Sequence, residues 1–137
     1  MEIIFVNKEE ILKLVESLNF PKEQFYILSS ACLTLYGLRD KAKDLDLCIT
    51  EELFEKIKEK YDLNDSKKNE CNFYKLNDLV EVVVNKKEEF ANKYDIKEGY
   101  QVQKLEIMRT DKAKRGLPKD LKDIANIDEY LKKKPSR

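Results

Sequence analysis

The spacing of apolar residues divides the chain into short helices and strands. Asn7 stands three residues before Glu10, a capping-box pattern that predicts a helix start. The apolar residues that follow recur at helical spacing: Ile11, Leu14, Val15 and Leu18. Further on, "DLDLCI" at residues 44–49 alternates polar and apolar positions. Because alternate side chains of a strand point to opposite faces, this run predicts a strand with one buried face.

The same two periodicities predict the rest of the fold. Strands are expected over 25–29 and 44–49 and in two hairpins, within 72–85 and 94–102, which turn at Asn77-Asp78 and Glu98-Gly99. After the first helix, further helices are expected over 30–38, 50–61, about 86–93, 104–114 and 118–132. Thr50 is expected to cap the helix over 50–61, and the helix over 118–132 has a predicted buried stripe of Leu121, Ile124, Ile127 and Leu131. This order predicts an α+β fold, a mixed β-sheet covered by helices. We expect one domain over 1–131 and a polar tail over 132–137.

Composition and charge narrow the classes of function. Of the 137 residues, 42% are apolar and 39% are charged, against roughly 25% charged in ordinary domains. Basic and acidic residues both total 27, which argues against a generic nucleic-acid-binding protein with a basic excess. No apolar run approaches the ~18 residues of a membrane span, and the short, acidic start does not resemble a signal peptide. We therefore expect no membrane association.

The residue types also limit the chemistry. The chain has no histidine, which excludes Ser-His-Asp and Cys-His catalysis and histidine-based metal sites. The three cysteines, Cys32, Cys48 and Cys71, are odd in number and lack Cys-x-x-Cys spacing, so neither a disulfide framework nor a zinc site is indicated. A reducing cytoplasmic location is expected. Catalysis would have to use carboxylates, lysines, hydroxyls or a metal held by oxygen ligands.

Asp44 and Asp46 are the sharpest candidate site. Two residues apart on a strand, their carboxylates point to the same face while Leu45 and Leu47 anchor the other. Such carboxylates repel each other unless a cation lies between them. A hard divalent cation such as Mg²⁺ prefers carboxylate oxygens together with substrate phosphates. The alternative is a pair of surface acids on an edge strand.

Two further features extend this candidate site. Ser29 and Ser30 lie where a predicted strand runs directly into a helix, a turn at which a hydroxyl and backbone N–H groups can hold phosphate. The alternative is that Ser30 only caps the helix. Glu81 lies among apolar residues in "LVEVVV", where an unpaired carboxylate is costly to bury. The alternative is that Glu81 faces solvent.

The segment "YILSSACLTLYGLRDKAKDLDLCIT" resembles the active-site segment of the minimal nucleotidyltransferases, in the superfamily that shares the catalytic fold of DNA polymerase β. That segment has a strand, Gly-Ser at a helix start, and two acids flanking an apolar residue on the next strand. The end of the chain, "GYQVQKLEIMRTDKAKRGLPKDLKDIANIDEYL", resembles one bacterial branch of the superfamily, with Lys119, Asp120 and Asp123 in matching places. The resemblance covers about residues 26–131.

The resemblance implies a nucleotidyltransferase fold and an enzyme that transfers a nucleoside monophosphate from an NTP. It implies Mg²⁺ or Mn²⁺ as cofactor, Asp44, Asp46 and Glu81 as metal ligands and catalytic residues, and Ser30 as a phosphate contact. The chain departs from the pattern at Ser29, where the family has glycine, and at Glu81, where aspartate is commoner. Arg39, Lys112, Arg115 and Lys119 are candidate contacts to the triphosphate, against the alternative that they belong to solvated surfaces.

The acceptor is not indicated by the sequence. Zero net charge makes a small molecule or a protein a better acceptor than a long nucleic acid. Because the chain is short, the acceptor site would lie at a homodimer interface or on a partner protein. The alternative function is a non-catalytic protein on the same fold, such as a toxin–antitoxin component or a nucleotide-binding partner module. A purely structural α+β domain with surface acids is the third alternative.

Overall fold

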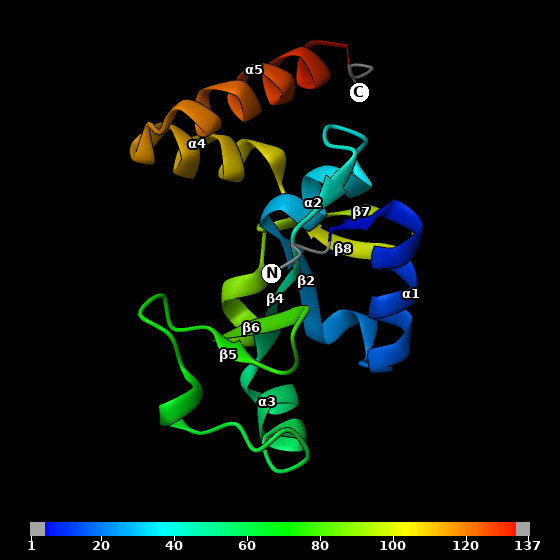
Figure 1. The fold of residues 1–137 in the computed structure, drawn as a ribbon, viewed down its shortest axis with the longest axis vertical. Coiled ribbons are helices and arrows are strands. Elements are labelled where there is room, and N and C mark those ends of the chain that lie inside the picture. The colour runs from blue at the N-terminus through cyan, green and yellow to red at the C-terminus, as the bar shows by residue number, and fades with distance from the viewer. Residues whose placement is uncertain (1–4, 134–137) are drawn as a thin grey trace.

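A six-stranded mixed sheet forms the centre of the protein (Figure 1). The computed structural model describes residues 5–133, with only the backbone of Lys67. The strands are β1 (Val6–Asn7), β2 (Phe25–Leu28), β3 (Lys41–Ala42), β4 (Leu45–Thr50), β5 (Tyr74–Lys75), β6 (Val80–Asn85), β7 (Tyr94–Lys97) and β8 (Tyr100–Gln103). The α-helices are α1 (Lys8–Leu18), α2 (Ser29–Leu35), α3 (Glu51–Ile57), α4 (Leu105–Arg115) and α5 (Pro118–Lys133). The predicted α+β class with a mixed sheet is confirmed.

The order of strands in the main sheet is β5-β6-β4-β2-β8-β7, and β1 and β3 form a separate pair. Strand β4 is antiparallel to β2, with Leu28 opposite Asp46, and parallel to β6, with Asp46 opposite Glu81. The end of β2 therefore meets the beginnings of β4 and β6. This topology gathers the sequence-predicted acids and the Ser29–Ser30 turn at one end of the sheet.

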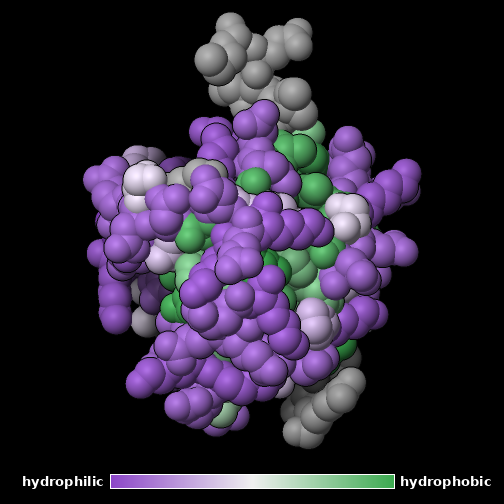
Figure 2. All heavy atoms as spheres, turned by 90° about the horizontal axis from the view of Figure 1, so that it is seen from below, coloured by the Kyte–Doolittle hydropathy of each residue, from purple (hydrophilic) through white to green (hydrophobic). Residues whose placement is uncertain are grey.

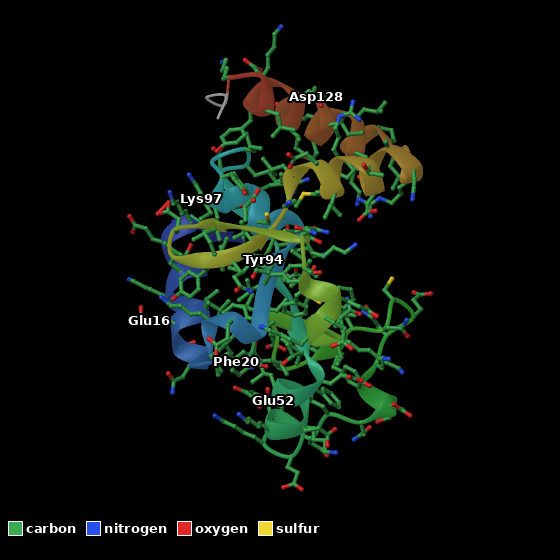
Figure 3. The ribbon with its side chains drawn as sticks, turned by 180° about the vertical axis from the view of Figure 1, so that it is seen from behind. Glu16, Phe20, Glu52, Tyr94, Lys97 and Asp128 are labelled. Atoms are coloured by element: carbon green, nitrogen blue, oxygen red, sulfur yellow. The ribbon has the colours of Figure 1, made fainter. Side chains whose placement is uncertain are left out.

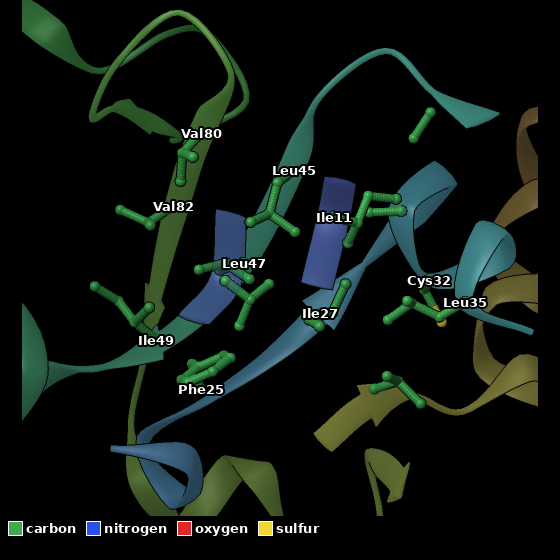
Figure 4. Close-up of a cluster of buried hydrophobic side chains, with 14 of the residues drawn as sticks. Ile11, Phe25, Ile27, Cys32, Leu35, Leu45, Leu47, Ile49, Val80 and Val82 are labelled. Carbon is green, nitrogen blue, oxygen red and sulfur yellow. The ribbon is translucent and has the colours of Figure 1, made fainter. Parts of the chain in front are cut away.

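One face of the sheet holds the main core (Figure 4). Leu45, Leu47 and Ile49 are fully buried, and Val80 and Val82 of β6 pack into the same cluster. The expectation that Leu45 and Leu47 anchor the buried face is confirmed. The other face has a smaller cluster of three buried residues, Tyr26, Cys48 and Phe90. Because side chains alternate along β4, Asp46 points to the face of this smaller cluster.

The first helix begins as predicted. The side chain of Asn7 accepts a hydrogen bond from the backbone N–H of Glu10, and the Glu10 carboxylate accepts one from the N–H of Asn7. Thr50 caps α3 through the N–H of Leu53, as its position predicts. This helix ends at Ile57, so the prediction that it continues to residue 61 is wrong.

Several other predicted boundaries are wrong by a few residues. The helix predicted over 30–38 covers Ser29–Leu35, and the helical piece predicted near 86–93 is a short 3-10 helix, η3 (Lys87–Phe90). Short 3-10 helices also precede β2, as η1 (Lys22–Gln24), and lie in the loop before β5, as η2 (Asp65–Lys67). Both hairpins form with the predicted turns. The hairpin β7–β8 places β7, with Tyr94 and Lys97, at one edge of the sheet (Figure 3).

Helices α4 and α5 form a hairpin at the opposite end of the molecule from α3 (Figure 1). The buried face of α5 differs from the predicted stripe. Ile127 is buried, but Leu121 is 60% exposed, and two aspartates, Asp120 and Asp123, take buried positions. Helix α5 runs through Lys133, and residues 134–137 of the predicted tail lie outside the described part.

Seen from the α3 end, hydrophilic side chains cover most of the surface, with hydrophobic atoms visible between them (Figure 2). Within residues 5–133, the helices are too short or too polar to cross a membrane.

Candidate active site

Three carboxylates lie on neighbouring strand segments. Asp46 on β4 is directly opposite Glu81 on β6, and Asp44 precedes the first residue of β4. All three side chains are half-buried, so neither a fully exposed pair of surface acids nor a fully exposed Glu81 describes them. We call Asp44, Asp46 and Glu81 the carboxylate cluster. The strand register thus brings Asp44, Asp46 and Glu81 together at one end of the sheet, as predicted.

Asp46 is the electrostatic centre of this cluster. Burial, first, and then the charges of Asp44 and Glu81 and the interaction with the Asp44 carboxyl together raise its pKa to about 7. Its Oδ1 atom is buried and has no hydrogen-bond partner within the described chain. Burial also raises the pKa of Asp44, while Lys43 and Asp46 lower it. A buried acceptor oxygen without a donor, surrounded by like charges, is an environment that a cation would stabilise.

The cluster is not arranged as a finished metal site. Across residues 5–133, no group of three or more cysteine, aspartate and glutamate side chains could hold a metal ion. The donor chemistry nevertheless fits a hard divalent cation, because all three side chains offer carboxylate oxygens and one of these oxygens is orphaned. Residues Asp44 and Asp46 with Glu81 are thus the set that would hold Mg²⁺ or Mn²⁺.

The Ser29–Ser30 turn begins next to Asp46, because Leu28 pairs with Asp46 in the sheet. Ser29 has a φ of +56°, in the left-handed region that glycine adopts most readily. At this position the minimal nucleotidyltransferases, which the segment resembles, have glycine. Ser30 does not cap α2: the N-cap position is Leu28, and no side chain within the described residues caps this helix. The interpretation of Ser30 as only a helix cap is therefore wrong.

A small cavity of about 230 Å³ opens beside this turn. Ser29 and Gln103 line it on one side, and Met108, Asp111, Lys112 and Arg115 of α4 line it on the other. Lys112 and Arg115 were candidate phosphate contacts, and they are the two basic side chains that α4 presents here. The chain thus places cations of α4 next to the turn that precedes the carboxylate cluster.

These cations are fixed by two buried aspartates of α5. Asp120 accepts two hydrogen bonds from Arg115, at 2.8 and 2.5 Å, and Asp123 accepts from Lys112 at 3.0 Å. Asp123 also accepts two hydrogen bonds from Arg39, at 3.3 and 3.0 Å. We call these five residues the ion-pair network. It ties α5 to α4 and to the loop after α2, and it directs the basic groups of α4.

The network lowers the pKa values of both aspartates, whereas the pKa of Asp46 is raised. Burial alone would raise the pKa of Asp123, but the hydrogen bonds and charges of Arg39 and Lys112 outweigh it, and the pKa is lowered. The hydrogen bonds from Arg115 hold the pKa of Asp120 far below its ordinary value. Both aspartates are therefore stable as anions.

Arg39 and Lys119 lie elsewhere. Both line a larger cavity, of about 440 Å³, between the loop after α2 and the first turns of α5. Neither residue lines the cavity at Ser29. The structure therefore groups Ser29 with Lys112 and Arg115, and Arg39 with Lys119, instead of bringing all the predicted phosphate contacts together.

Sequence reasoning missed two residues of the larger cavity, Lys41 and Lys122. Lys119 and Lys122 are three residues apart on α5, a spacing that places both on one helix face and that could have identified the second lysine. Lys41 follows the candidate Arg39 by two residues in the chain, and this closeness could have identified it.

Comparison of the chain with protein-family models, with curated proteins and with solved structures gives no match.

Proposed function

We propose that the protein is a metal-dependent nucleotidyltransferase, which moves a nucleoside monophosphate from an NTP to an acceptor. The observation that carries the proposal is the register of β4 and β6. It sets Asp46 opposite Glu81, with Asp44 beside them and an orphaned carboxylate oxygen at the centre. This arrangement is suited to an oxygen-seeking cation and a polyphosphate.

The turn after β2 supports the same proposal. Ser29 takes a left-handed conformation at the position where the resembling family has glycine. The Ser30 hydroxyl is available for a ligand because it does not cap α2. In the proposed reaction, Ser30 contacts the NTP phosphates, and Lys112 and Arg115 offset phosphate charge from the adjoining cavity.

The carboxylates would have separate tasks. Asp44 and Asp46 would bind Mg²⁺ or Mn²⁺, which supplies neutralisation of the charge that develops on the phosphate oxygens. Glu81, half-buried beside Asp46, would complete the ligand set and accept the proton of the acceptor hydroxyl. In a chain without histidine, a carboxylate is the available general base. The acceptor is a small molecule or a protein, bound where a second copy or a partner completes the site.

The test is pyrophosphate release from a labelled NTP with Mg²⁺ or Mn²⁺, across a panel of acceptors: small molecules including aminoglycosides, candidate partner proteins and tRNA. We expect release with one acceptor class. Glu81→Gln should reduce the rate by roughly 10²–10⁴, as loss of a positioned base does, while nucleotide affinity stays within a few fold.

Glu88→Gln is the matched control, because Glu88 is an exposed acid on η3, directly after the same strand. It should leave the rate unchanged. Nucleotide binding without release from any acceptor, and without an effect of Glu81→Gln, would instead assign the protein to the non-catalytic alternative.

A further inference from the structure

The larger cavity, between the loop after α2 and the start of α5, has a strongly basic lining. Four cationic side chains surround it, those of Arg39, Lys41, Lys119 and Lys122. Two acids, Asp40 and Asp123, also line it. Asp123 is already engaged by Arg39 and Lys112. We call this cavity the basic pocket.

Two of its cations lack counter-charges. Within residues 5–133, Lys119 and Lys122 make no ion pair with a carboxylate. Both are exposed on the first turns of α5, and their three-residue spacing directs them to the same side of the helix. Keeping two unpaired ammonium groups beside Arg39 is unfavourable unless an anion or solvent screens them.

The other cations are held in place. Asp123 fixes the Arg39 guanidinium through two hydrogen bonds, at 3.3 and 3.0 Å, while the side chain stays 35% exposed. A guanidinium held by one edge keeps further N–H donors for a second anion. Lys41 lies over the ring of Phe5, at 4.9 Å from its centre. Phe5 gives the pocket an aromatic wall beside its cations.

We propose that the basic pocket binds a phosphate monoester of a small ring-bearing molecule. The lining offers a fixed guanidinium and two unpaired ammonium groups, which match a phosphate dianion in charge and in donor number. A volume of about 440 Å³ exceeds what a phosphate alone fills and lies in the range of ordinary ligand sites. The exposed Phe5 ring would pack against the ring of the ligand.

This binding site is separate from the proposed transfer reaction. The basic pocket contains neither Ser29 nor any member of the carboxylate cluster. Its connection to the candidate active site is Asp123, which holds Arg39 on one side and Lys112 on the other. Binding in the pocket requires no metal and no NTP.

The test is a titration of the protein that is monitored by ¹⁵N NMR, with EDTA present to remove divalent cations. The probes are AMP, ribose 5-phosphate, inorganic phosphate and adenosine. We expect AMP or ribose 5-phosphate to shift the amide signals of residues 38–41 and 119–123. Binding of either ester supports the proposal. The ester that binds more tightly identifies a nucleotide or a sugar phosphate as the type of ligand. Adenosine, which lacks the phosphate, should cause no such shifts.

Variants then locate the site. The double variant Lys119→Ala/Lys122→Ala should weaken ester binding by about tenfold or more, since two charge-assisted contacts are lost. Asp40→Asn should strengthen it, because it removes an acid from the lining. The control Lys13→Ala/Lys93→Ala removes the same charge from exposed lysines outside the pocket and should leave affinity unchanged.

Three results would overturn the proposal: no ester shifts these signals at millimolar concentration, the Lys119/Lys122 variant binds as tightly as the wild type, or inorganic phosphate binds as tightly as both esters. Loss of ester binding in Asp44→Asn/Asp46→Asn would also overturn it, by placing the ligand at the carboxylate cluster. None of these readouts depends on transferase activity.

Discussion

Two regions of the protein bury aspartates in opposite ways. In the ion-pair network, Asp120 and Asp123 are almost inaccessible, and three basic side chains neutralise them and lower their pKa values. In the carboxylate cluster, the neighbours of Asp46 are two further acids, its pKa is raised to about 7, and one oxygen lacks a partner. The first arrangement stabilises the fold. The second costs free energy in the absence of a cation, which is the pattern expected of a binding site.

Of the variants considered, the largest change in stability is expected at Asp123. Asp123→Asn removes the charge that neutralises Arg39 and Lys112, and should lower the free energy of unfolding by about 2–3 kcal/mol, since a largely buried ion pair is disrupted. Urea denaturation measures this loss. Asp128→Asn is the control, because Asp128 forms an exposed ion pair with Arg109 between the same two helices (Figure 3). Its loss should lower the free energy of unfolding much less. Equal losses for the two variants would contradict the structural role of the network.

At Asp46 the expected effect has the opposite sign. Without metal, Asp46→Asn should raise the free energy of unfolding at pH 8 by about 1–2 kcal/mol, because a carboxylate with a raised pKa is ionised there at a cost. The advantage of the variant should disappear in acid. Because the folded-state pKa is above the ordinary value, wild-type stability relative to the variant is full below pH 4 and falls as the pH rises from about 4 to about 7.

Chemical denaturation of both proteins from pH 4 to pH 8 provides the measurement. Taking the difference between them removes the contribution of Asp120 and Asp123, whose lowered pKa values make stability fall only as the solution becomes strongly acidic. A difference that stays constant across this range would show that Asp46 has an ordinary pKa.

The smallest expected effect concerns the turn beside the cluster. Ser29→Gly should raise the free energy of unfolding by about 0.5–1 kcal/mol, because a non-glycine residue at a φ of +56° is strained by more than the added flexibility of the unfolded chain costs. The variant should keep or improve nucleotide affinity, since the backbone can approach phosphate more closely. Asn19→Gly, at another left-handed position remote from the site, controls for the strain alone. A destabilised Ser29→Gly variant would mean that the serine side chain is needed at this turn.

The sequence predicted the local features of the fold and of the carboxylate pair, because these depend on neighbours. The alternation in "DLDLCI" was enough to place Leu45 and Leu47 in the core and Asp46 on the opposite face. The Asn7 and Thr50 caps are equally local. The register that sets Asp46 opposite Glu81 is a contact across the sheet, which the resemblance implied and periodicity did not.

Helix α5 shows why contacts between distant elements could not be predicted from the sequence. Helical spacing favoured Leu121 as a core residue, but burial on α5 follows the basic groups of α4 and of the loop after α2. Asp120 and Asp123 are buried because Arg39, Lys112 and Arg115 reach them, and these partners lie on other elements. Likewise, the pairing of Arg39 with Asp123 and its place in the basic pocket depend on a partner 84 residues away in the chain, which the sequence pattern did not indicate.

The central claim is that the carboxylate cluster binds a divalent cation together with a nucleotide. Isothermal calorimetry of ATP binding at pH 8, with and without Mg²⁺, tests it most directly. We predict binding that requires Mg²⁺ in the wild type and is abolished in Asp44→Asn/Asp46→Asn, while the double variant stays folded. ATP binding that is equally tight in the double variant, or that does not depend on Mg²⁺, would contradict the account.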